Sequence, residues 1–390
     1  MRLLYVTESV PTRDPEHGDG SSMISWEVIR NLPAQVSVTL LTFEGPVGVA
    51  DEVRQRCEAV HVLPTRRHLA AAVSSVLSLH DVGTMERTTR AAAATAARLS
   101  SRCDVSLVHG PHVLFLARHL RGPMVLQTVD PWSVRVGMES AMTQGWKTGY
   151  RSMKSRLLLR SERRIPPRAR LLTVAPRDAA EWSDRLGREV RSIPNGVATH
   201  LRAARRREHP VVCFVGSLNY GPNISSVEIL IQQIAPMVWR EVPQAAFLIA
   251  GRRPVPAVMS LAGPRVEVRA NVADVASVFE EADVAVFPDE HGVGIRNSVQ
   301  EALAAGLPVV ATPVAARGQE VHPLLTVEED LECFSREVAS RLTVNRRARG
   351  LEGNNAALRS WGDVANDYLG ELETALHEIS GRLQQEGRSF

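Results

Sequence analysis

The chain has 390 residues, of which 44% are hydrophobic and 23% charged, and its formal net charge is +3. This length exceeds one ordinary hydrophobic core, so two domains are expected. The small net charge argues against a nucleic-acid-binding protein. No apolar run approaches the roughly 18 residues of a membrane-spanning helix. Only Lys147 and Lys154 are lysines among the 46 basic residues. Arginine suits phosphate recognition, and a GC-rich genome explains the arginine excess at least as well.

The cysteines and the first residues indicate the compartment. The chain holds Cys57, Cys103, Cys213 and Cys333, far apart and in no metal-binding or redox spacing. Met1 leads directly into a strand pattern that is too short and too soon polar for a signal peptide. We therefore expect reduced thiols in a cytoplasmic protein.

Short apolar runs alternate with helical periods along the whole chain, which predicts βα units and parallel sheets. The strands expected in the first half are 2–7, 36–43, 59–63, 105–109, 124–128 and 170–174. Those expected in the second half are 211–215, 246–250, 266–269, 284–287 and 309–312. Each half therefore predicts its own doubly wound α/β domain. We assign residues 1–190 to the first domain, 191–365 to the second, and 366–390 to a helix that packs back on the first.

Two helical stretches have a distinctive composition. Residues Ala91–Leu99 are nearly all alanine, which predicts a helix packed closely on a sheet. Residues Arg151–Arg170 are dense in arginine around a small apolar cluster. A solvated helix face explains this pattern, and a dock for an anionic acceptor or a membrane surface is the alternative.

The segment Phe287–Pro313 (FPDEHGVGIRNSVQEALAAGLPVVATP) carries the most chemical information. A hydrophobic strand runs into a loop with Gly292 and Gly294, and a helix with Arg296 near its start follows. Unpaired backbone N–H groups and the helix dipole make such a loop an anion cradle. Glu301, one turn into the helix, suits the hydroxyls of a ribose better than a phosphate. The segment therefore predicts a nucleotide site.

Other local patterns accompany this one. They are SIPNGV (192–197), CFVGSLNYGPN (213–223), LIAGRRP (248–254), GVGIRNSVQEALAAGLPVVATP (292–313) and HGDGSS (17–22). Together they resemble the GT-B glycosyltransferases, and in particular the retaining, GT4-like branch with the "glycosyl transferases group 1" domain. The resemblance implies two Rossmann-like, doubly wound domains facing an interdomain cleft.

The resemblance also implies the activity. It predicts a retaining hexosyl transfer from a nucleotide-diphosphate sugar to an acceptor hydroxyl, with no resident cofactor and no metal. The acceptor stays open among a polysaccharide, a lipid-linked sugar and a secondary metabolite, and the donor base and sugar stay open too. The expected partners are the nucleotide sugar and this acceptor, without nucleic acid or a transmembrane segment. Peripheral membrane contact is compatible with the sequence.

The catalytic residues implied are Asp130, Arg252 and Arg296. Asp130 follows the strand expected at 124–128, where family members place a residue facing the donor sugar. The two arginines are expected to stabilise the negative charge that grows on the leaving diphosphate.

The donor-binding residues implied lie on Gly loops and strand ends of both domains. They are Gly18, Gly20, Ser21, His109, Ser217, Asn219, Asn223, Val272, Glu290, Gly292, Gly294, Ile295, Asn297 and Glu301. For Glu301 a structural salt bridge is the alternative to a ribose contact, and for His109 a satisfied structural histidine is the alternative.

Three departures from the family pattern support a second hypothesis. Val293 stands where the common motif has a glutamate eight positions before Glu301, and Asn219 and Asn223 replace the usual basic residues of the first nucleotide-domain loop. A catalytically silent homologue that binds nucleotide sugars or activates a partner is therefore the alternative function. A dehydrogenase is disfavoured, since residues 1–21 lack G-x-G-x-x-G.

Overall fold

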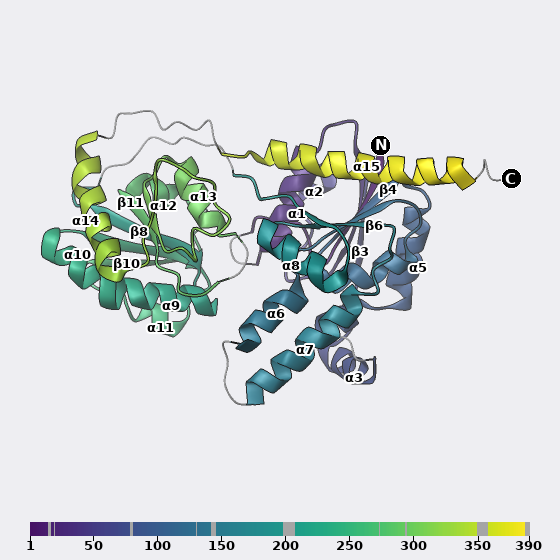
Figure 1. Cartoon of the computed structure of the whole chain (residues 1–390), viewed down its shortest axis with the longest axis horizontal. Helices are drawn as coiled ribbons and strands as arrows, with labels where there is room; N and C mark the ends of the chain where they lie inside the picture. The colour runs from purple at the N-terminus through teal and green to yellow at the C-terminus, as the bar shows by residue number, and fades with distance from the viewer. Residues whose placement is uncertain are drawn as a thin grey trace. The chain divides into compact units, whose positions relative to one another are not determined.

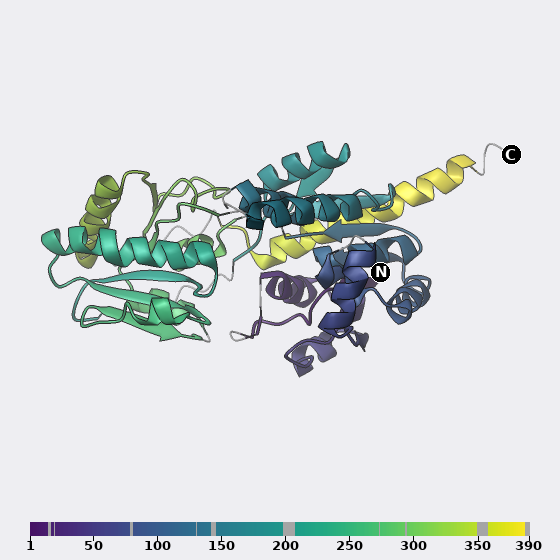
Figure 2. The same ribbon diagram turned by 90° about the horizontal axis from the view of Figure 1, so that it is seen from below.

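The structure is a computed structural model that describes residues 1–14, 17–18, 20–78, 81–129, 131–141, 146–197, 207–272, 274–292, 295–348 and 358–386. The chain forms two compact units (Figures 1 and 2). Unit 1 comprises Met1–Arg13, His17–Asn195 and Trp361–Phe390, and unit 2 comprises Asp14–Glu16 and Gly196–Ser360. Each unit is an α/β layer structure with its own hydrophobic core.

The described part of unit 1 contains a seven-stranded parallel sheet in the order β3-β2-β1-β4-β5-β6-β7. Its strands are β1 (Arg2–Thr7), β2 (Ser37–Phe43), β3 (Ala59–Leu63), β4 (Val105–His109), β5 (Met124–Gln127), β6 (Ala169–Thr173) and β7 (Val190–Ser192). The central strands are buried on both faces, as their apolar runs require. The order of the strands reverses between β1 and β4, which makes this the switch point of a doubly wound sheet.

Helices cover both faces of this sheet (Figure 2). They are α1 (Gly20–Asn31), α2 (Asp51–Arg56), α3 (His68–Ser78), α4 (Val82–Arg87), α5 (Arg90–Ser100), the 3-10 helix η1 (Pro111–His119), α6 (Trp132–Ala141), α7 (Trp146–Glu162), α8 (Pro176–Leu186) and α15 (Trp361–Glu386). In α5, Ala92 and Ala96 are fully buried, because small side chains let the helix approach the sheet closely.

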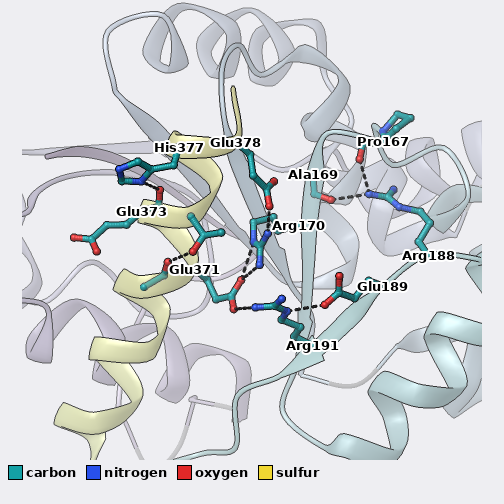
Figure 3. Close-up of polar contacts among 12 residues, drawn as sticks. Pro167, Ala169, Arg170, Arg188, Glu189, Arg191, Glu371, Glu373, His377 and Glu378 are labelled. Carbon is teal, nitrogen blue, oxygen red and sulfur yellow. Dashed lines mark hydrogen bonds and ion pairs between the residues drawn. The ribbon is translucent and has the colours of Figure 1, made fainter. Parts of the chain in front are cut away.

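The last helix, α15, lies far from the rest of unit 1 in sequence but belongs to its core. Tyr368 and Leu372 are almost completely buried together with residues of β1, β4 and α1. Figure 3 shows the polar contacts that fix it: Arg170 donates from Nε to Glu371 at 2.8 Å and also pairs with Glu378. Arg191 on β7 reaches the other oxygen of Glu371 at 3.1 Å. The sheet of unit 1 therefore binds α15 by an apolar face and by ion pairs.

The described part of unit 2 contains a six-stranded parallel sheet in the order β10-β9-β8-β11-β12-β13. Its strands are β8 (Val211–Ser217), β9 (Ala246–Arg252), β10 (Val266–Ala270), β11 (Val284–Phe287), β12 (Val309–Ala311) and β13 (Leu325–Val327). Its helices are α9 (Gly221–Ile229), the π-helix η2 (Leu230–Ile234), α10 (Ala235–Glu241), α11 (Pro256–Met259), α12 (Ala276–Glu281), α13 (Asn297–Ala304) and α14 (Leu331–Ala348).

The predicted fold class, α/β with two doubly wound parallel sheets, is confirmed. The sequence analysis placed the end of the first domain at residue 190, whereas unit 1 continues through β7 to Asn195. It placed the start of the final helix at residue 366, whereas α15 begins at Trp361. None of the described helices is long and apolar enough to cross a membrane.

Candidate functional site

The carboxyl edge of the unit 2 sheet is the natural place for a ligand. The strand order reverses between β8 and β11, and in open parallel sheets ligands bind outside the carboxyl ends of strands at this reversal. The loops that leave β8, β9 and β11 carry most of the residues predicted from the sequence. Those of the described residues are Ser217, Asn219, Asn223, Arg252, Glu290, Gly292, Ile295 and Arg296.

The loop after β8 is closed by Asn223, the third residue of α9. Its Nδ2 donates to the carbonyl of Ser217 at 2.9 Å, and its Oδ1 accepts from Arg296 at 3.0 Å. A Cβ on Gly216 would lie 2.8 Å from Asn223 Nδ2, so only glycine lets the side chain cross here. Asn223 is buried and both ends of its amide are used within the protein. Ser217 is half-buried and Asn219 is exposed at the mouth of the loop.

Arg296 lies at the N-cap of α13 and points into unit 2. Its guanidinium pairs with Asp289, and Nη2 donates to the carbonyl of Val215 at 3.3 Å. Its Cζ lies 5.0 Å from the ring centroid of Phe214 and 4.7 Å from that of Phe287, so the cation also contacts both of these neighbouring aromatic rings. Burial lowers the pKa of Arg296, and the Asp289 carboxylate opposes this shift.

Asp289 connects three strand ends through this ion pair. Its carboxylate accepts from Ser226 Oγ of α9 at 2.7 Å, and its carbonyl accepts from Thr312 Oγ1, just after β12, at 2.6 Å. The network of Asn223, Ser226, Asp289, Arg296 and Thr312 thus holds the loops after β8, β11 and β12 in one arrangement. A buried charge pair of this kind is strongly destabilised when one partner is removed.

The sequence analysis assigned Arg296 to the diphosphate, and that assignment stays a prediction. In this structure its guanidinium is committed to Asp289, Asn223 and Val215. The geometry therefore supports a positioning role, in which Arg296 holds the loop whose backbone would meet the ligand. Asp289 and Ser226 were missed, although an aspartate directly after a fully apolar strand signals a buried ion pair.

The remaining part of the β11–α13 loop is supported from the segment after β12. Arg317 Nη1 donates to the carbonyl of Gly292 at 3.1 Å, and Gln319 Nε2 donates to that of Arg296 at 3.0 Å. Gly318 has φ +73°, and a Cβ there would lie 2.9 Å from Cγ1 of Ile295. These contacts hold the β11–α13 loop at Gly292 and at Arg296, which are the two ends of the predicted anion-binding loop. Gly294 lies outside the described residues.

The loop after β9 approaches the same edge. A Cβ on Gly251 would lie 1.7 Å from the carbonyl oxygen of Gly216, so glycine is required where β8 and β9 meet. Arg252, at the end of β9, is half-buried. The backbone turns at Arg253, whose N–H donates to Oδ1 of Asn271 at 2.8 Å. Val272 directly follows Asn271 and is half-buried, and its predicted contact to the donor stays a prediction.

Helix α13 presents the carboxylate predicted to bind ribose. Asn297 and Glu301 lie one turn apart and both are half-buried, whereas Val299, Ala302 and Leu303 pack into the core. Residues four apart share one face of a helix, so Asn297 and Glu301 lie on the same face of α13. Glu290 is exposed on the loop before it.

The predicted residues of unit 1 lie at the carboxyl edge of its own sheet. Gly20 and Ser21 begin α1, and Gly18 is buried in the loop before it. His109 ends β4 and is fully buried, with Nδ1 3.3 Å from the hydroxyl of Tyr5. Burial lowers the pKa of His109 to about 3, so the ring is neutral at physiological pH. Asp130 lies outside the described residues.

Buried polar atoms accompany His109 at this edge. Within the part of the chain that the structure describes, Nε2 of His109, both polar side-chain atoms of Gln127 and Oγ1 of Thr128 have no hydrogen-bond partner. His109 and Gln127 are register partners on β4 and β5. Gln127 and Thr128 were not identified from the sequence, although polar residues at the end of an apolar strand were a usable signal. Among the described residues, no group of three or more His, Cys, Asp or Glu is arranged to hold a metal ion.

Comparison with known proteins agrees with this arrangement. Residues 209–343 match the family model described as "Glycosyl transferases group 1". A GDP-mannose-dependent alpha-mannosyltransferase of Mycolicibacterium smegmatis is 28% identical over 283 residues, which cover 69% of this chain and 72% of that protein.

Solved structures share the whole fold. Sucrose-phosphate synthase from Thermosynechococcus elongatus superposes with a TM-score of 0.61 at 14% identity over 100% of both chains. Anabaena HepE, solved with UDP and glucose, gives a TM-score of 0.57 at 13% identity over 98% of this chain and 99% of its own.

The family match and the sequence relative, together with this fold, identify a nucleotide-sugar-dependent glycosyltransferase. Its fold is that of the GT-B glycosyltransferases, and residues 209–343 match the "Glycosyl transferases group 1" domain. The comparisons do not favour the alternative of a catalytically silent homologue.

Proposed function

We propose that the protein is a retaining, metal-independent hexosyltransferase that uses GDP-mannose and transfers the sugar to an acceptor hydroxyl. The observation that carries the proposal is the carboxyl edge of unit 2, where the loops after β8 and β11 are held together by the Arg296–Asp289 network beside α13. The relative from M. smegmatis supports the choice of donor.

In this proposal the β11–α13 loop receives the diphosphate with backbone N–H groups, and Glu301 accepts hydrogen bonds from the ribose hydroxyls. Arg252, at the end of β9, adds positive charge as the bond between the anomeric carbon and the diphosphate oxygen breaks. The acceptor oxygen bonds to the same face of the sugar, and its proton passes to the leaving phosphate. This route needs no protein nucleophile.

The donor assignment is tested by thermal unfolding with GDP, UDP, TDP and ADP. A ligand that binds only the folded protein adds about 2.7 kcal/mol at one hundred times its dissociation constant. We expect GDP to stabilise the wild type most and to lose this effect in Glu301→Ala. The matched control is Glu241→Ala, at the exposed end of α10, which leads into the amino end of β9. Equal stabilisation of Glu301→Ala and wild type would contradict the ribose role.

Activity is tested separately by the slow hydrolysis of GDP-mannose in the absence of acceptor. Retention predicts that the α-anomer of mannose appears first in the NMR spectrum, and metal independence predicts an unchanged rate with EDTA. A β-anomer that appears first would overturn the retaining mechanism. Nucleotide binding without any hydrolysis would restore the silent homologue as the better hypothesis.

A further inference from the structure

One side of unit 1 combines exposed apolar and basic side chains. Helices α3 and α7 both lie on the side away from α15 in Figure 1, and both face the viewer in Figure 2, which is seen from below. The exposed residues of these two helices, of the loop before α3 and of the turn after α7 are here called the basic-apolar face. These residues are Arg66, Arg67, Leu69, Val73, Met153, Arg156, Arg160 and Arg163.

The α3 part of this face is apolar with a basic edge. Leu69 is 82% exposed and Val73 is 63% exposed, while Ala71 between them is fully buried. Leu69 and Val73 lie four residues apart, so they share the outer side of the helix. Arg66 and Arg67 directly precede the helix and are exposed. Such large exposed apolar side chains beside one another mark an interaction surface more often than a bare solvent face.

The α7 part of the face is a stripe of cations. Met153, Arg156 and Arg160 are exposed at spacings of three and four residues, which places them on one side of the helix, and exposed Arg163 follows directly after its end. Met153 is 53% exposed and lies at one end of this stripe. The other side of α7 is buried through Ser155, Leu158 and Glu162.

The acidic side chains described near this face are engaged elsewhere. Residues 151–170 hold eight basic residues and one acidic residue, Glu162. Glu162 is buried and accepts hydrogen bonds from Ser133 at 3.1 Å and from Trp182 at 2.9 Å. Asp81, in the connection after α3, is paired with Lys154 at 3.1 Å.

The other nearby carboxylate is also engaged. Glu86 of α4 pairs with His68 at 2.7 Å. Within the described residues, Arg67, Arg156 and Arg160 make no ion pair. The basic-apolar face therefore keeps a net positive charge.

We propose that the basic-apolar face binds unit 1 to the surface of an anionic lipid bilayer. Arginines near an anionic leaflet are attracted by its surface potential, and leucine, valine and methionine side chains gain by entering the boundary between headgroups and acyl chains. A soluble polyanion would use the cations alone and would leave Leu69 and Val73 without a partner. The combination of both kinds of side chain favours the bilayer.

The test is flotation of the full-length protein with lipid vesicles. One set of vesicles is phosphatidylcholine, and in the other about a third of it is replaced by phosphatidylglycerol. We expect binding to the anionic vesicles only. The triple variant Arg156→Gln/Arg160→Gln/Arg163→Gln should lower the partition coefficient about 100-fold. The double variant Leu69→Ser/Val73→Ser should lower it about tenfold.

The matched control removes the same charge from elsewhere in unit 1. Arg54→Gln/Arg98→Gln/Arg102→Gln changes exposed arginines on α2 and at α5, and it should alter binding less than about twofold. Equal binding to both vesicle types, or an equal loss in the control, would overturn the proposal. An unchanged partition coefficient in the Leu69/Val73 variant would also overturn it, because binding would then rest on charge alone and the apolar side chains would not enter the bilayer. None of these variants changes a residue of the proposed donor site. The flotation result is therefore independent of the proposed transferase chemistry.

Discussion

At the scale of single residues, the ion pair between Arg296 and Asp289 decides how the nucleotide loop is held. Arg296→Ala should lower turnover at least tenfold, and Asp289→Asn should have an effect of the same order if the arginine acts through the loop. Each change should also cost about 3–5 kcal/mol of unfolding free energy, because it leaves one buried charge unpaired.

A double-mutant cycle of turnover and urea unfolding checks this coupling. The double variant Asp289→Asn/Arg296→Ala should lose much less than the two single losses added together. Arg240→Ala, at an exposed position of α10, is the control and should stay within about 0.5 kcal/mol of the wild type. Additive losses would show that Arg296 has a direct role that does not pass through Asp289.

His109 makes the stability of unit 1 depend on pH. Burial lowers its pKa from 6.5 to about 3. The unfolded chain therefore binds a proton that the folded chain does not, so stability is complete above pH 6.5 and falls as the pH drops toward 3. The slope is about 1.4 kcal/mol per pH unit within that window.

The pH prediction is checked by urea unfolding at several pH values between 4.5 and 7.5. His109→Gln should flatten the acid slope by about one proton, whatever its effect on absolute stability. His377→Gln, on the exposed side of α15, should leave the slope unchanged. An unaltered slope in His109→Gln would contradict the assignment of a neutral buried ring.

At the scale of elements, α15 stabilises unit 1 mainly through its apolar side. Leu372 is fully buried against the sheet, so Leu372→Ala should cost about 2–5 kcal/mol. Leu69→Ala removes the same atoms from a site that is 82% exposed and should change stability by less than about 0.5 kcal/mol. Chemical denaturation of both variants compares them directly. Similar losses would mean that α15 does not belong to the cooperative core.

Comparison of predicted and observed strands shows which strands an apolar sequence pattern can predict. Buried parallel strands such as 284–287 are continuous apolar runs, and they were placed within a residue or two of their observed ends. The short edge strands β7 and β13 were missed as strands, because three residues with mixed exposure form no apolar run. Edge pairing is decided by the neighbouring strand and not by local composition.

Some residues of the candidate site were predictable from local sequence, and others were not. Glycine loops after apolar strands are a local signal, and Gly292 lies in the loop after β11 where that signal placed it. Asn223 was predicted to face the donor, but both ends of its amide bind within unit 2. Asp289 and Ser226 meet only when the sheet forms, so their partnership is a tertiary property that one sequence does not display.

At the scale of the whole molecule, the two units differ in how their cores are assembled. The core of unit 2 comes from one continuous stretch, residues 196–360, whereas unit 1 needs α15 from beyond that stretch. We expect the fragment 196–360 to unfold cooperatively on its own and the fragment 1–195 to be much less stable. Fusing residues 361–386 to the shorter fragment through a flexible linker should restore it. A fragment 1–195 as stable as the fused form would contradict this dependence.

The position of α15 also sets an order of events during synthesis. The residues of unit 2 leave the ribosome before α15 does, and translation proceeds at about 5–20 residues per second. For a period on the order of ten seconds, the part of the unit 1 core that α15 covers therefore stays exposed while unit 2 is being made. The nascent chain should be a client of chaperones during this interval, and unit 2, the later half in sequence, should be the first to reach its native core.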